Sequence, residues 1–190
     1  MDLLDGIRQF NLADIIIVLL LVGAFVFGFV TGVVQQLLTL LVWVISLLLA
    51  GNLMEPFGRW VSGYWTTFSL PYSMMLGFLL TFIVFVVVGE VLIFVFYKRA
   101  PMVARLAFLD ELVGGALAVG VALLIIGTVV MGIDSFYQNN PVASSAEQPI
   151  AKIINDGLVG SVIASWLRGS LIPAIALLGP LLPTELRGIA

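Results

Sequence analysis

The sequence of 190 residues contains no cysteine and no histidine. Without cysteine, neither disulfide bonds nor thiolate metal sites can form in any redox compartment. Without histidine, the commonest metal ligand and the commonest general base at neutral pH are missing. The adjacent serines Ser144 and Ser145 therefore have no histidine to activate them. We expect no metal site, no bound cofactor and no enzymatic activity.

Charged residues are scarce as well. They make up 10% of the chain, against 62% for hydrophobic residues, and the net charge is −3. This balance leaves no basic footprint for binding nucleic acid. A soluble domain of this size could not cover so much apolar surface with so few charges. Asp2 and Asp5 stand where a secretory signal would be positive, so we expect an integral membrane protein without a cleaved signal.

The apolar runs give the number of membrane spans. The stretch from Ile15 to Met54 has no charged residue. As a single helix it would be about 60 Å long, roughly twice the hydrocarbon thickness of a bilayer. Two antiparallel helices that turn near Thr31 and Gly32 fit better, because glycine permits a tight turn. With two later apolar runs, the predicted spans are 13–30, 33–51, 73–96 and 112–133.

The predicted fold is therefore all-α, with a four-helix membrane domain at 1–137, a polar linker at 138–149 and an amphipathic or interfacial segment at 150–190. Between the second and third spans, four aromatic residues resemble an interfacial belt, namely Trp60, Tyr64, Trp65 and Tyr72. Over 150–170, apolar residues at i, i+4 spacing predict an amphipathic helix that lies on the membrane or covers the bundle. These residues are Ile150, Ile154, Leu158, Val162 and Trp166. The run at 171–182 is too short to span, and we interpret it as interfacial or re-entrant.

The basic residues give an orientation. Lys98, Arg99 and Arg105 lie in the short connection between the third and fourth spans. The positive-inside rule then favours this connection in the cytoplasm, with both termini on the extracytoplasmic side.

Two stretches carry a family resemblance. Asp14 precedes a turn glycine, Gly32, and a helix tryptophan, Trp43, and a second stretch places Asp110 four residues before Gly114. This order resembles the CvpA family, the colicin V production proteins of bacterial inner membranes. The resemblance implies a small inner-membrane protein linked to toxin production or export and to envelope maintenance.

The sequence also departs from the family pattern. Thr31, Gln35 and Gln36 stand where the family usually has Arg, Arg and Glu, and Ala118 replaces a second glycine. Glu111 stands where a basic residue is usual. A role carried by the family's charges is therefore not transferred to these positions.

Glu90 is the most prominent candidate functional residue, because it lies in an apolar span about two turns before Lys98. An acid at this depth is a proton, cation or ligand site, or an interfacial side chain bonded to a neighbouring helix. Thr31, Gln35 and Gln36 either line a polar path or mark a helix entering the headgroup region. Asp14, Asp110, Glu111 and Asp134 lie at predicted span ends, where capping is the favoured interpretation.

Small residues mark expected helix contacts. Gly114, Ala118 and Ala122 form a small-xxx-small ridge beside Gly115, which favours close packing of helices within one chain or between two copies. Gly28, Gly32 and Gly89 are further candidates for close approach.

Two functions are compatible with these features. The first is a non-enzymatic accessory or scaffold protein of the inner membrane, in toxin production or export and in envelope homeostasis. Its expected partners are the lipid bilayer and membrane or envelope proteins, including a second copy of the chain. The alternative is a small channel or transporter subunit with a polar path at Glu90, Gln35 and Gln36. Four largely apolar helices offer few groups to line a pore, which favours the scaffold.

Overall fold

The structure, a computed structural model, describes residues 11–64, 69–97, 107–139 and 156–170. In these ranges the elements are α2 (Leu12–Thr31), α3 (Val33–Tyr64), α4 (Leu70–Phe96), α5 (Ala107–Asn139) and α8 (Val162–Ser170). The first four contain segments that are long and apolar enough to cross a membrane. The expected all-α, multi-pass membrane architecture is confirmed.

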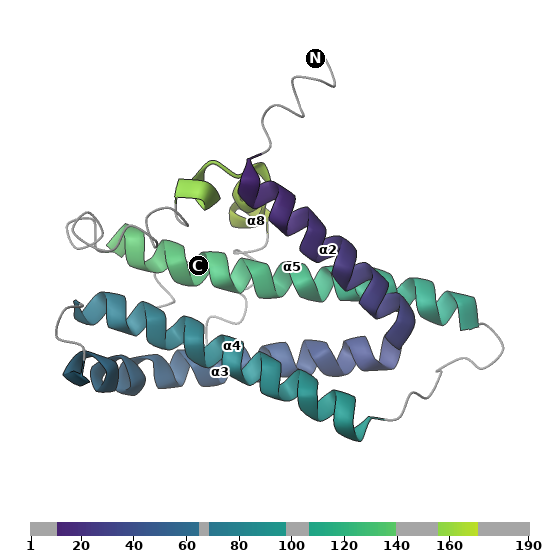
Figure 1. The fold of residues 1–190 in the computed structure, drawn as a ribbon, viewed down its shortest axis with the longest axis horizontal. Helices are drawn as coiled ribbons and strands as arrows, with labels where there is room; N and C mark the ends of the chain where they lie inside the picture. Colours follow the sequence, from purple (N-terminus) through teal and green to yellow (C-terminus); the bar gives the residue numbers. More distant parts are fainter. Residues whose placement is uncertain (1–10, 65–68, 98–106, 140–155, 171–190) are drawn as a thin grey trace, which may run out of the picture.

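The four long helices run alternately in opposite directions and form two pairs. α2 packs mainly on α5 and α3 mainly on α4, and α3 also contacts α5 (Figure 1). We call the end that holds the α2–α3 turn, the end of α4 and the start of α5 the hairpin end. The opposite end, where α8 lies against α2 and α5, is the α8 end.

The turn between α2 and α3 depends on one glycine. Gly32 has a φ of 83°, the only positive φ among the described residues, and its N–H donates to the carbonyl oxygen of Gly28 at 2.9 Å. Other residues adopt this left-handed backbone only with strain. α3 begins at the next residue, so the reversal lies where the sequence placed it.

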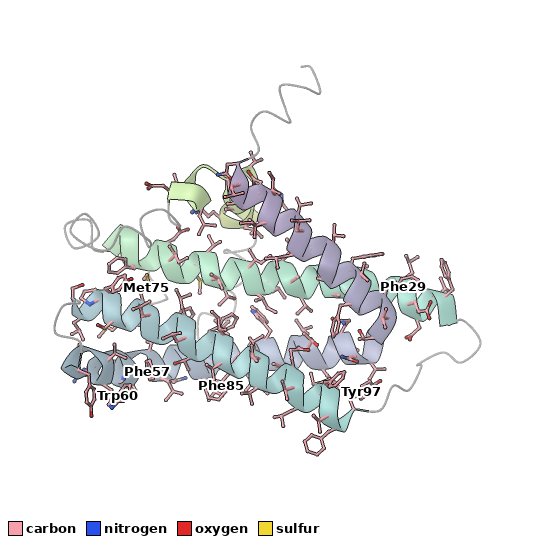
Figure 2. The ribbon with its side chains drawn as sticks, in the orientation of Figure 1. Phe29, Phe57, Trp60, Met75, Phe85 and Tyr97 are labelled. Carbon is pink, nitrogen blue, oxygen red and sulfur yellow. The ribbon has the colours of Figure 1, made fainter. Side chains whose placement is uncertain are left out.

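Two helices run past the predicted span ends at 51 and 133. α3 has 32 residues, about 48 Å, whereas the hydrocarbon core is about 30 Å thick. On its extension Phe57, Trp60 and Tyr64 form a row, with ring centroids 5.6 and 5.2 Å apart (Figure 2). Trp60 and Tyr64 are exposed, as an interfacial belt requires.

The structure gives a different result for Tyr72, another residue of the expected belt. Tyr72 is buried, and its ring packs edge-on against Phe136 at 5.5 Å. Its assignment to the belt is therefore wrong, because the start of α4 lies against α5 rather than lipid. Trp65 lies outside the described residues.

The main core fills the space between α3, α4 and α5. Its buried side chains are Trp43, Leu47, Ala50, Met54, Phe78, Phe82 and Met131. Trp43 Nε1 donates to Thr128 Oγ1 at 3.0 Å, and the Thr128 hydroxyl donates to the Leu124 carbonyl oxygen at 2.9 Å. The one polar atom of the tryptophan is thus satisfied inside the apolar core.

The C-terminal helix is shorter than predicted. A helical turn at 156–159 is followed by a break at Gly160 and Ser161, and α8 begins at Val162. The Ser161 hydroxyl accepts from the N–H of Ala164 at 3.0 Å, which is an N-cap. The prediction of one continuous helix over 150–170 is therefore wrong for its described part.

The break changes which face of α8 is packed. Ala164 and Leu167 are fully buried, whereas Val162 and Trp166 of the predicted stripe are 45% and 53% exposed. α8 is amphipathic, but a different edge covers the bundle. Ile150, Ile154, most of the predicted linker and the segment 171–182 lie outside the described residues.

Candidate functional site

Four of the predicted packing residues meet at the hairpin end. Gly28 and Gly32 of the α2–α3 hairpin lie directly on Gly114 and Ala118 of α5. A Cβ atom on Gly114 would lie 2.7 Å from the Gly28 carbonyl oxygen and 2.8 Å from Gly32 Cα. At this separation the two backbones touch, which is how small residues hold helices together in a bilayer. We call these four residues the glycine crossing.

Asp110 lies beside the turn, in the first turn of α5. It is buried, and a Cβ on Gly32 would lie 2.5 Å from Asp110 Oδ2. A side chain at position 32 is therefore excluded twice, by the positive φ and by this carboxylate.

The remaining small residues contact other parts of the same chain. Gly115 faces the ring of Phe25, and Gly89 faces the side chain of Val42. Ala122 lines the cleft described below. The contacts of Gly115 and Gly89 are within one chain, which is one of the two arrangements that the sequence left open.

The two glutamines are buried, with 7% of Gln35 and 2% of Gln36 exposed. Gln36 Nε2 donates to Thr31 Oγ1 at 2.8 Å, and the Thr31 hydroxyl donates to the Phe27 carbonyl oxygen at 2.9 Å. Gln36 and Thr31 thus tie the two helices together across the turn. Neither glutamine extends outward as a marker of the headgroup region would.

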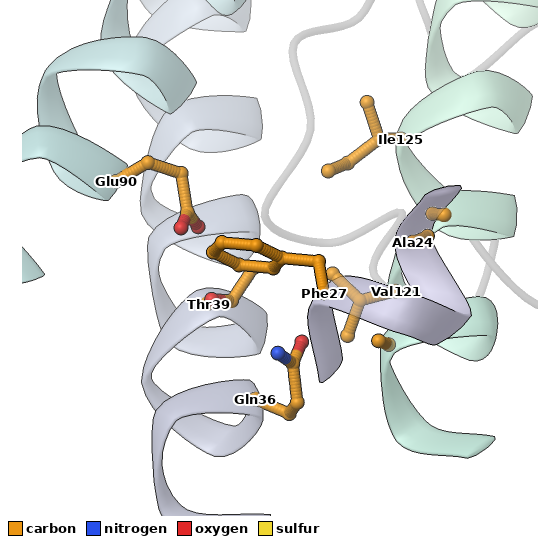
Figure 3. A pocket seen from close by; sticks show the side chains of 9 residues that line it. Ala24, Phe27, Gln36, Thr39, Glu90, Val121 and Ile125 are labelled. Atoms are coloured by element: carbon orange, nitrogen blue, oxygen red, sulfur yellow. The ribbon is translucent and has the colours of Figure 1, made fainter. Parts of the chain in front are cut away.

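A cleft of about 300 Å³ lies between the two helix pairs (Figure 3). All four long helices contribute to its lining. Its lining residues are Ala24, Phe27, Gln36, Thr39, Glu90, Ala118, Val121, Ala122 and Ile125. Of the predicted polar residues, the cleft thus brings Glu90 and Gln36 together and leaves Gln35 and Thr31 outside its lining.

Glu90 and Thr39 are the unusual pair in this cleft. Their side chains reach toward the same space from α4 and α3, with the ring of Phe27 from α2 beside them (Figure 3). Within the described part of the chain, neither Glu90 Oε1 nor Thr39 Oγ1 has a hydrogen-bond partner, although both atoms are buried. A buried polar atom without a partner costs about 1–3 kcal/mol, and more when it is charged. The cleft therefore holds a carboxylate oxygen and a hydroxyl with open hydrogen-bonding capacity, and the hydroxyl can also donate to the carboxylate.

A second polar cluster lies at the α8 end and centres on Asp14, which is fully buried. Its carboxylate accepts from the Ser161 hydroxyl at 2.6 Å and from the N–H groups of Ile163 and Val162 at 2.9 and 3.3 Å. It also accepts from the N–H of Asn11 at 3.0 Å, which completes a capping box at the start of α2. One side chain thus joins the beginnings of two helices.

An ion pair holds the other side of α8. Arg168 Nε and Nη2 donate to the two carboxylate oxygens of Asp134 at 2.6 and 2.9 Å, and Nη1 donates to the Leu158 carbonyl oxygen at 3.1 Å. Ion pairs in which arginine donates to both oxygens of a carboxylate are stronger than hydrogen bonds between neutral groups. Asp134 ends the apolar part of α5 but lies five residues before the helix end, so it pairs with α8 rather than capping α5.

The sequence did not identify Thr39, Ser161 or Arg168 as partners. A threonine in an apolar helix commonly bonds to its own backbone, so Thr39 gives no signal. The Asn11 and Asp14 spacing does predict a capping box, but the bond from Ser161 crosses 147 residues. Among the described residues, no three His, Cys, Asp or Glu side chains lie close enough to hold a metal ion. The groups gathered here are suited to hydrogen bonding and charge pairing.

A family model described as colicin V production protein matches residues 13–158, which include α2 to α5. No curated protein and no solved structure matches the chain. α8, with Arg168, lies beyond the matched residues, whereas the glycine crossing and the cleft lie inside them.

Proposed function

The chain belongs to the colicin V production protein family, and on this basis we propose that it is a non-enzymatic accessory or scaffold protein in toxin production or export and in envelope homeostasis. The observation that carries the proposal is the family match, which extends over all four long helices. The residues at which the sequence resembled the family occupy structural positions. Gly32 makes the turn, Gly114 lies in the glycine crossing and Trp43 is in the core.

We place the protein in the bacterial inner membrane, with both termini on the extracytoplasmic side. The alternating helices put the α4–α5 connection at the hairpin end, and this connection carries Lys98, Arg99 and Arg105. By the positive-inside rule the hairpin end then faces the cytoplasm and α8 faces the other side. Reporter fusions that are active on only one side of the membrane test this orientation at each end of the chain.

The outward face of α2 is the best supported surface for membrane partners. It carries exposed apolar side chains along its length, among them Leu19, Val22, Val26 and Val30. Lipid can cover such a face, and so can a helix of another membrane protein or of a second copy.

The decisive experiment is complementation. In a colicin V-producing strain that lacks its own family member, this chain should restore toxin activity in the culture supernatant. Cross-linking through residues of the exposed α2 face should recover envelope or export proteins. Normal toxin release without the chain, or no restoration by a chain that reaches the membrane at normal abundance, would contradict the export role.

The alternative, a channel or transporter subunit, has one favourable observation, the cleft with Glu90, Thr39 and Gln36. Ion or solute flux through liposomes containing the purified chain separates the two functions. A scaffold should give flux equal to protein-free liposomes, and a channel should exceed it in a manner that Glu90→Gln reduces.

A further inference from the structure

We propose that the cleft between α2 and α4 is a lipid site, in which Glu90 and Thr39 hold the primary ammonium group of an aminophospholipid such as phosphatidylethanolamine. The proposal concerns a ligand of the membrane domain, so it stands whether or not the chain acts in toxin export.

The chemistry of the lining selects an ammonium group. Glu90 Oε1 is an acceptor, and Thr39 Oγ1 keeps acceptor capacity even when its hydroxyl hydrogen turns toward the Glu90 carboxylate. No Lys or Arg is among the lining residues. The amide nitrogen of Gln36 donates to Thr31 Oγ1. A primary ammonium brings a positive charge and three N–H donors, so it can bond to both oxygens at once.

The depth of Glu90 favours a headgroup. It lies six residues before the end of α4 at Phe96, about 9 Å along the helix. α4 is about 40 Å long, and the hydrocarbon core is about 30 Å thick. A centred α4 therefore places Glu90 only about 4 Å inside the hydrocarbon boundary. The ammonium group of a lipid whose chains lie in the same leaflet can reach this level.

The surroundings of the cleft favour a molecule with acyl chains. α2 and α4 are not among the closely packed helix pairs, and the cleft lies where the α2–α5 pair and the α3–α4 pair meet. Besides three polar side chains its lining is apolar. On α4, Val87 and Val91 are exposed within three residues of Glu90. A soluble amine would leave these surfaces uncovered, whereas a phospholipid covers them.

The test is lipid binding to the purified, delipidated full chain, measured by native mass spectrometry in detergent. The probes are dioleoyl phosphatidylethanolamine, dioleoyl phosphatidylcholine and free ethanolamine. The choline headgroup carries the same charge but has no N–H donor. We expect the wild type to bind the ethanolamine lipid about tenfold more tightly than the choline lipid.

Substitutions locate the site. Glu90→Gln should abolish the preference, and Glu55→Gln should retain it, because Glu55 is an exposed glutamate on α3. Thr39→Val should weaken the preference while keeping the side-chain shape. Ala24→Leu should lower binding of both lipids by filling the cleft, and its control Gly23→Leu should not, because nothing lies within 4 Å of a Cβ at Gly23.

Three results would overturn the proposal. Equal binding of the two lipids by the wild type would mean that the cleft does not recognise the N–H donors of an ammonium group. A preference that survives both Glu90→Gln and Thr39→Val would place the lipid elsewhere. Competition by free ethanolamine at the concentration of the lipid would make the ligand a small amine.

Discussion

The buried acids of the α8 end and the Glu90 carboxylate in the cleft near the hairpin end differ in their hydrogen bonding. At the α8 end, Asp14 accepts four hydrogen bonds and Asp134 is paired with Arg168 on both oxygens. At the hairpin end, Glu90 Oε1 and Thr39 Oγ1 share a cleft and have no partners among the described residues.

The difference distinguishes polar groups whose hydrogen bonds are completed by the protein from polar groups that can still bond to a ligand. A carboxylate whose bonds are completed by the protein fixes the elements that supply them, as Asp14 fixes the starts of α2 and α8. A carboxylate left open lowers stability, and the fold retains it beside a space into which a ligand fits. The following predictions test this contrast, from the largest expected effect to the smallest.

The contrast requires that the hairpin end be held by contacts such as the glycine crossing and not by Glu90. Gly114→Leu should lower the free energy of unfolding by about 3 kcal/mol or more, because the new side chain meets backbone that cannot move aside. Unfolding by a denaturing detergent measures the change. Gly120→Leu on the same helix is the control, since a Cβ there meets nothing within 4 Å. If the two substitutions lowered the free energy of unfolding equally, the glycine crossing would not be what holds the hairpin end.

At the α8 end, Asp14→Ala should destabilise the protein by about 2–3 kcal/mol, since it leaves the Ser161 hydroxyl and three N–H groups without their acceptor. It should also increase the rate of proteolysis in α8. Asp156→Ala, at an exposed aspartate just before the break, should change neither measurement. If α8 stays protected in Asp14→Ala, the Asp14 bonds do not hold it.

Arg168→Leu leaves Asp134 buried without its partner. We expect a loss of about 1–2 kcal/mol, less than for a fully buried pair because a quarter of the Arg168 side chain is exposed. The double variant Asp134→Leu and Arg168→Leu should recover most of this loss in the same unfolding assay. Arg59→Leu, which breaks the exposed pair with Glu55, is the control and should have little effect.

The smallest expected effect is at the hairpin end. Because Glu90 Oε1 has no partner to lose, Glu90→Gln should leave the free energy of unfolding within about 1 kcal/mol of the wild type or raise it. Glu55→Gln, which removes an exposed carboxylate, shows how much the loss of an acidic group alone changes the free energy of unfolding. A loss as large as that of Asp14→Ala would show that Glu90 is a structural residue and would end the contrast between the two ends.

Much of the fold could be predicted because the bilayer sets the length of an apolar helix. The uncharged stretch from Ile15 to Met54 is too long for one span, and Gly32 is where the backbone can reverse. The extension of α3 to Tyr64 could not be read in the same way, because beyond the membrane helix length is set by packing and not by hydrocarbon thickness.

The candidate site was predicted unevenly for related reasons. Glu90 stands out as an acid in an apolar run, but its neighbour Thr39 is an ordinary residue there. The partner of Asp14 lies 147 residues away, beyond any local pattern. The apolar stripe through Val162 and Trp166 is exposed, so of its two predicted roles it is not the one that covers the bundle; Ala164 and Leu167, which the i, i+4 pattern did not include, make that contact.

The long separation between Asp14 and Ser161 also gives the protein an order of assembly. The ribosome makes Asp14 among the first residues of the first span, and its acceptor capacity is filled only when Ser161 has been made. At about 5–20 residues per second, the carboxylate waits roughly 7 to 30 s for this partner. α8 therefore docks only after the four long helices have been made, and a chain truncated before Ser161 would carry an incompletely bonded aspartate at the start of its first helix.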